Sequence, residues 1–170
     1  SKLIVGIGRV AKSAGLTFND LSDSSKQAFL GILRHSCQQG LLLGASGQPL
    51  SNTLWALAQM KTNFWTDITL DLRSSVMAVV YKECKENADF TDQALATILL
   101  AFSKMKIQWE QVPLPVQSAL STSLCRVCLR GGDREIAAQA IGNILYALGS
   151  MEAARLQLTD RVAIAIEIAI

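Results

Sequence analysis

Aromatic and charged residues are scarce in this 170-residue chain, and histidine occurs only once. Aromatic side chains make up 6% of the residues and charged side chains 18%, against roughly 25% charged residues in typical soluble domains. Because half of the residues are apolar, the composition excludes a disordered chain. A single histidine nearly excludes a Ser-His-Asp site or a histidine-based metal site. We therefore predict a core-rich binding module that is not an enzyme, with no catalytic residues, no metal and no cofactor.

The sequence also lacks the signals of a membrane or secreted protein. No apolar run approaches the ~18 to 20 residues that a membrane-spanning helix needs, and the first residues have no signal-peptide cleavage site. Four cysteines do not make a disulfide framework, which favours an intracellular protein. The net charge of +2 permits a nucleic-acid partner without demanding one. Because the chain has no initiator methionine, we expect it to be an excised or processed segment.

A repeated segment of eleven residues is the main signal in the sequence. Copies span residues 50–60, 95–105 and 141–151, and a weaker copy spans residues 3–13. Each copy has apolar residues at helical spacing, and the small side chains of Ala56 and Ala58 would let another helix approach closely. The alignment predicts that the shared apolar positions are buried, namely Leu54, Leu57, Leu99, Phe102, Leu145 and Leu148. In the weaker copy, Ile7 and Val10 align with these positions.

A second helical pattern follows each copy after a short loop, and Ser, Thr, Asp or Pro residues precede it, as at helix starts. These loops carry bulky residues, namely Phe18, Phe64, Trp65, Ile107 and Trp109, of which Trp65 and Trp109 are expected to fill the hairpin ends. Because a hairpin buries its apolar face only against its neighbours, the sequence predicts an all-α fold, an α-solenoid of about four helical hairpin repeats. The expected repeats are 1–47, 48–92, 93–138 and 139–170, with helices at 1–14 and 23–39, 48–60 and 69–86, 91–105 and 113–130, and 133–150 and 159–170.

The end of the chain leaves two questions open at the sequence level. Residues 162–166 alternate in a way that suits a strand, although their place in the repeat favours a helix. The last expected helix carries no polar cap, which a terminal repeat normally has. We therefore expect a single solenoid segment that belongs to a longer array, with further repeats or domains of the same chain.

Residues 52–58, Asn-Thr-Leu-Trp-Ala-Leu-Ala, resemble the hallmark LWALA helix of octotricopeptide-type repeat proteins. Residues 99–103 and 144–149 are degenerate forms of the same helix. The resemblance implies a helical-repeat fold that acts in RNA metabolism inside an organelle, a mitochondrion or chloroplast. Related arrays occur in secreted effectors of intracellular bacteria, which act in the host cytosol. The repeat period here is longer than that of the family and is similar to the length of HEAT or armadillo repeats.

Short polar side chains recur on one face of the repeated helix, because positions 48, 52, 56 and 59 lie on one side of a helix. Amide side chains can read base edges by paired donors and acceptors. The alternative is an ordinary solvated helix face. We predict RNA or partner binding by this ladder, with lysines at its rim: Gln48, Asn52, Gln59, Gln93, Thr97, Lys104, Gln139 and Asn143, with Lys12 and Lys61.

Two weaker rows have both a functional and a structural interpretation. A row of Gly8, Trp55, Leu100 and Tyr146 can stack on bases or pack at the edge of the core. A basic row on the second helices can follow phosphates or complement helix C-termini. The basic row consists of His35, Lys82 and Arg126, of which Lys82 and Arg126 are the candidate phosphate contacts.

Cys125 and Cys128 form a Cys-x-x-Cys pair without a second pair, whereas a zinc site needs about four ligands. Cys128 aligns with Cys37 and Cys84, so we predict packing positions rather than a redox or metal site. The sequence thus leaves two functions open. We expect single-stranded RNA binding, in RNA processing, translation or a ribonucleoprotein. The alternative is a protein–protein interaction scaffold, for example within a bacterial effector.

Overall fold

The computed structural model describes residues 2–44, 46–129, 138–153 and 164. Within these ranges the chain is all-α, as predicted, and contains no strand. The helices begin and end close to the expected bounds, and the expected pattern at 133–137 and most of 159–170 lies outside the described residues. The elements are α1 (Lys2–Ser13), η1 (Phe18–Asp20), α2 (Asp23–Gln38), α3 (Gln48–Gln59), α4 (Leu70–Glu86), α5 (Asp92–Lys104), η2 (Trp109–Gln111), α6 (Leu114–Leu129) and α7 (Ala138–Ser150).

Local sequence explains where several of these helices start. Ser22 precedes α2, and its hydroxyl accepts a hydrogen bond from the Ser25 amide at 3.3 Å. Thr91 caps α5 in the same way through the Ala94 amide. Side-chain oxygens at these positions satisfy amides that have no partner within the helix. None of the helices in the described ranges combines the length and apolar content needed to cross a membrane.

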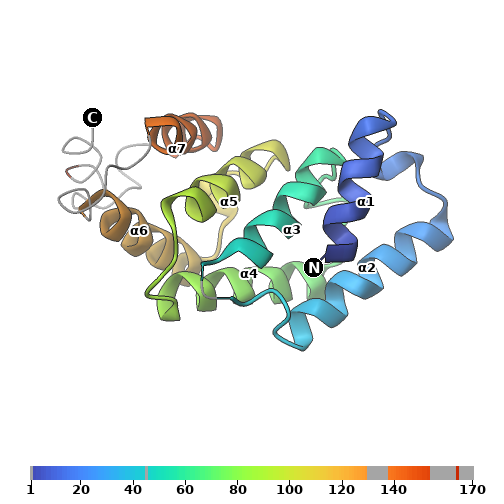
Figure 1. The fold of residues 1–170 in the computed structure, drawn as a ribbon, viewed down its shortest axis with the longest axis horizontal. Coiled ribbons are helices and arrows are strands. Elements are labelled where there is room, and N and C mark those ends of the chain that lie inside the picture. The colour runs from blue at the N-terminus through green and yellow to red at the C-terminus, as the bar shows by residue number, and fades with distance from the viewer. Residues whose placement is uncertain (1, 45, 130–137, 154–163, 165–170) are drawn as a thin grey trace.

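The helices form two layers (Figure 1). The first layer contains α1, α3, α5 and α7, and each of them packs on the next one. The second layer contains α2, α4 and α6, which contact one another in the same order. The core lies between the layers, where Leu54 and Leu99 are fully buried.

Successive hairpins are joined by a recurring backbone hydrogen bond. The amide of Phe18 donates to the carbonyl of Met60 at 2.7 Å, and the amide of Phe64 donates to the carbonyl of Met105 at 3.4 Å. The amide of Trp109 donates to the carbonyl of Met151 at 2.8 Å. The side chains of all three donors are buried. Of the two tryptophans expected to fill hairpin ends, Trp109 is buried and Trp65 is half-buried.

The end of each first-layer helix has the same backbone geometry. The residue after the last turn has a positive φ, and the next amide donates back to the third residue before the helix cap, as in a Schellman motif. The positive-φ residues are Gly15, Lys61, Lys106 and Glu152. Because Gly15 matches Lys61, the first two copies are offset by 46 residues rather than 47.

This offset corrects the predicted alignment of the first copy. Gly8 and Ala11, both buried, occupy the positions of Leu54 and Leu57, whereas Val10 is 68% exposed. Ile7 is half-buried. Lys12 therefore matches Ala58 rather than Gln59. The cause of the error is that α1 turns small side chains toward the core, and hydrophobic periodicity does not detect them.

The predicted core positions are otherwise buried, with one exception in α7. Leu148 is buried, but Leu145 is 38% exposed, and Ile144 is buried beside it. Leu99, at the matching position of α5, is covered within the two-layer core. The second-layer segment expected opposite Leu145 lies outside the described residues.

Gly8 lets α1 approach α3 closely. A Cβ atom placed on Gly8 would lie 2.7 Å from the Cβ of Ala56, much closer than carbon atoms normally approach. The expectation that Ala56 permits close helix packing is therefore confirmed.

We expect Gly8→Ala to lower the free energy of unfolding by about 1–3 kcal/mol, because the added methyl group overpacks the α1–α3 contact. Gly31 lies in the middle of α2 with open space around it. The matched change Gly31→Ala should instead stabilise the chain by about 0.5–1 kcal/mol, since alanine has the higher helix propensity. Denaturant titration of both variants measures the difference. Equal effects of the two substitutions would contradict the close contact.

Leu99 is fully buried on α5, which packs between α3 and α7. Leu99→Ala should therefore lower the free energy of unfolding by about 2–5 kcal/mol, because it leaves a cavity with neighbours on both sides. Denaturant titration checks this value. A decrease under about 1 kcal/mol would show that the site is not packed as described.

Candidate functional site

The predicted polar ladder lies at the surface of the first layer. None of its side chains is buried, so they are accessible to a ligand. Gln48, Asn52, Gln93, Lys104 and Gln139 are exposed, Gln59, Thr97 and Asn143 are half-buried, and Lys12 and Lys61 are exposed.

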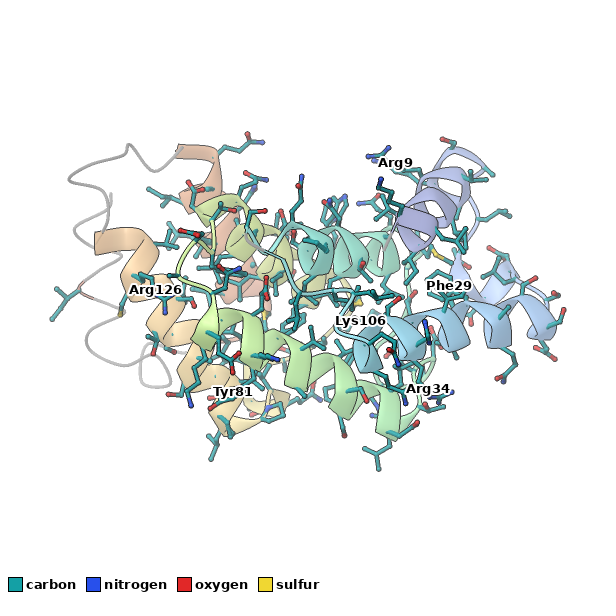
Figure 2. All side chains as sticks on the ribbon, turned by 60° about the horizontal axis from the view of Figure 1, so that its bottom comes forward. Arg9, Phe29, Arg34, Tyr81, Lys106 and Arg126 are labelled. Atoms are coloured by element: carbon teal, nitrogen blue, oxygen red, sulfur yellow. The ribbon has the colours of Figure 1, made fainter. Side chains whose placement is uncertain are left out.

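Three of these residues meet in a groove between α1 and α3. The groove has a volume of about 240 Å³, and Asn52, Gln59 and Lys12 line it. Arg9 and Trp55 complete its polar and aromatic lining, above a floor that includes the Gly8–Ala56 contact. The lining residues of each helix lie three or four positions apart, which brings them to one face. Figure 2 shows Arg9 extending from α1 on the side of α3.

A second hollow of about 280 Å³ continues this groove toward the start of α1. Lys2, Arg9 and Asn52 line it together with small or apolar residues. The two hollows share Arg9 and Asn52. Their lining contains three cations and no carboxylate, so an anionic ligand would meet no like charge there.

Trp55 also contacts a cation of α5. The Lys104 ammonium lies 5.6 Å from the centre of the Trp55 ring, within the range of a cation–π interaction. Lys104 of α5 is thus a ladder residue that contacts a residue of the groove, although it does not line the groove itself. Together these side chains offer cations, a planar ring and neutral amides within one continuous surface.

Sequence reasoning missed Lys2 and Arg9 because it placed Gly8 in the row with Trp55. Gly8 is buried against α3. With the corrected offset of 46 residues, given by Gly15 and Lys61, Arg9 is the residue that matches Trp55. The corrected row is Arg9, Trp55, Leu100 and Tyr146, of which Tyr146 is 65% exposed.

The polar side chains of the ladder have different hydrogen-bond partners in different hairpins. On α5 the Thr97 hydroxyl donates to the carbonyl of Gln93 at 2.7 Å, and the Gln93 amide group donates to the Thr97 hydroxyl at 3.4 Å. These amide and hydroxyl groups therefore have local partners, whereas the groove residues Asn52 and Gln59 line an open volume. Lys61, expected at the rim, does not line the groove.

Arg126 has a structural role at the end of α4 (Figure 2). Its guanidinium donates to the carbonyls of Asn87 at 2.9 Å and Cys84 at 3.4 Å. The Ser123 hydroxyl, one turn earlier on α6, also donates to the Cys84 carbonyl. These bonds satisfy carbonyls that have no partner within the helix. Lys82, the other candidate phosphate contact, is exposed on α4.

The cysteines of α2 and α4 are packing residues. Cys37 and Cys84 are buried, and burial raises the pKa of the Cys37 thiol to about 11 and that of Cys84 to about 12. Both thiols therefore stay protonated and unreactive near neutral pH. In the part of the chain that the structure describes, no group of three or more His, Cys, Asp or Glu side chains is placed to hold a metal ion.

Comparisons of the chain with protein-family models, curated proteins and solved structures found no match. The resemblance to octotricopeptide-type repeats therefore stays a prediction.

Because Arg126 donates hydrogen bonds to the end of α4, replacing it should destabilise the chain more than replacing Lys82, the matching residue of the basic row. Arg126→Met should lower the free energy of unfolding by about 1.5–3 kcal/mol, because the carbonyls of Asn87 and Cys84 lose a charged donor. Lys82→Met, at the matching exposed position, should change it by no more than about 0.5 kcal/mol. Thermal or denaturant unfolding of the two variants checks this. Equal decreases would contradict a capping role for Arg126.

Proposed function

We propose that this chain is an α-solenoid segment of about four helical hairpin repeats that binds single-stranded RNA on the outer face of its first layer. The groove between α1 and α3 is the observation that carries this proposal. Its lining combines cations, an indole ring and two amides without a carboxylate. We expect this activity in an organelle, as the octotricopeptide resemblance implies, or in a host cytosol for an effector.

The order of contacts between helices supports the solenoid. First-layer helices contact one another in chain order, and so do second-layer helices. The bond between a turn amide and the next methionine carbonyl recurs at three successive junctions. Such repetition of one junction is typical of stacked repeats.

The chemistry of the groove suits the parts of a nucleotide. Arg9 and Lys12 are the side chains for phosphate oxygens, since guanidinium and ammonium groups bind them through charge-assisted hydrogen bonds. Trp55 offers a ring on which a base can stack. Asn52 and Gln59 supply donors and acceptors for a base edge. Each of these parts lies within one groove.

A single strand fits this groove better than a duplex does. Bases can stack on aromatic rings and expose their edges to amides only when they are not paired in a helix. At about one base per repeat, as in other helical-repeat RNA readers, four repeats would cover only about four bases. We therefore expect weak binding by this segment and tighter binding in a longer array.

A protein–protein interaction scaffold is the second candidate function. One observation favours it: α1 also exposes an apolar face, on which Leu3 is 59% and Val10 is 68% exposed. Exposed apolar patches of this kind mark interaction sites on soluble proteins. That face is separate from the groove between α1 and α3.

Binding to short single-stranded RNA pools at two salt concentrations tests the RNA function. Arg9→Met and Lys12→Met should weaken binding to all sequences alike and lower the salt slope by about 0.7 for each phosphate that the variant no longer neutralises. Asn52→Ala and Gln59→Ala should flatten the sequence preference and keep most of the salt dependence. Fluorescence anisotropy measures both quantities.

Two further variants sharpen this test. Trp55→Leu keeps an apolar side chain but removes the ring, and it should weaken binding by about 1–3 kcal/mol for one stacked base. Lys82→Met tests the predicted phosphate row of the second layer, and it should leave binding unchanged because Lys82 does not line the groove. Dissociation constants no tighter than about 100 μM at low salt would reject the RNA function. Equal weakening by Lys82→Met and Lys12→Met would reject the groove as its site.

A further inference from the structure

The apolar face of α1 forms a groove on the side of the helix that points away from α3. This groove has a volume of about 380 Å³, and Leu3, Ile7, Val10, Leu16 and Leu21 supply most of its apolar lining. Gly8 contacts α3, and Val10 lies two residues further along, about 200° around the helix. The face therefore has no first-layer neighbour among the described residues, although its composition is that of a packing surface.

The same face is buried in every later first-layer helix of the described residues. With the offset given by the helix ends, Val10 matches Ala56, Ala101 and Ala147, all of which are buried. Ala56 faces Gly8 of the preceding helix, so this row of positions receives the preceding hairpin. In the row of Ile7, Thr53, Ile98 and Ile144 are buried. In the row of Leu16, Thr62 and Ile107 are buried and Ala153 is half-buried.

We propose that this face of α1 binds a further helical hairpin of the same repeat type, supplied by the same polypeptide on the amino-terminal side of Lys2. The hairpin packs on α1 as α1 packs on α3. A terminal repeat that faces solvent normally carries polar residues on such a face, and Leu3 and Val10 are apolar and exposed. The stack of hairpins thus extends beyond α1 on its amino-terminal side.

The junctions already present define the contacts that the incoming hairpin makes. The carbonyls of Met60, Met105 and Met151 accept a hydrogen bond from the turn of the preceding hairpin. Ala14 occupies the matching position of α1, because Gly15 matches the positive-φ residue that follows each methionine. The Ala14 carbonyl therefore accepts an amide of the incoming turn. Val10 is larger than the alanines in its row, so the incoming helix presents a small residue opposite it.

Thiol labelling at position 10 tests this inference independently of RNA binding. Val10→Cys places a reactive group at the centre of the face, and Ser118→Cys serves as an exposed control on α6. Both are made with Cys125→Ser and Cys128→Ser, while Cys37 and Cys84 react slowly because they are buried and have raised pKa values. In the 170-residue chain alone, Val10→Cys should react as fast as the control.

The decisive measurement uses the natural full-length polypeptide under native conditions. There, Val10→Cys should react at least about 10-fold more slowly than Ser118→Cys, since labelling requires the hairpin to open. Joining a copy of residues 1–46 ahead of Ser1 should slow labelling in the same way, because it gives Lys2 the chain position of Gln48 after α2 and presents the small Gly8 of the copy to Val10. Equal rates at the two positions of the full-length protein would overturn the inference. Slow labelling that appears only at high protein concentration would assign the face to a second copy, and would also overturn it.

Discussion

The close contact between first-layer helices is the constraint on which the arrangement depends. Gly8 and Ala56 bring α1 and α3 so near that a single added methyl group would collide. At that distance the turn of one hairpin reaches the end of the next first-layer helix, and the Phe18 amide can bond to the Met60 carbonyl. At this first junction the close helix contact and the backbone bond between the hairpins therefore occur together.

The same spacing shapes the outer surface. Because α1 and α3 meet through small residues, the longer side chains beside them diverge and leave a groove between Arg9 and Lys12 on one helix and Asn52 and Gln59 on the other. Where the lining includes an indole ring, as at Trp55, the groove gains a flat wall, and Lys104 of α5 adds charge behind it. The shape of this groove is thus a consequence of how closely the two helices pack.

The sequence predicted the helix bounds well, but it aligned the first copy of the repeat wrongly with the later copies. Helical periodicity and capping residues identified the helices of the described ranges to within a few residues. In α1, however, two of the three buried positions are the small residues Gly8 and Ala11, beside Ile4, while Val10 is exposed. Hydrophobic periodicity therefore identified the wrong face, and Arg9 was missed as a groove residue. The bonds of Arg126 to α4 were likewise not predictable, because they depend on how α6 lies against α4.

The junction bonds are formed by main-chain atoms alone, from the amides of Phe18, Phe64 and Trp109 to methionine carbonyls. Main-chain bonds do not depend on which side chain stands at either end, so the residues at a junction can change identity while the hairpins stay in register. Each of these amides also belongs to one junction only. Its hydrogen exchange rate therefore reports the separation of one pair of neighbouring hairpins, and the set resolves whether the array opens from an end or at its middle.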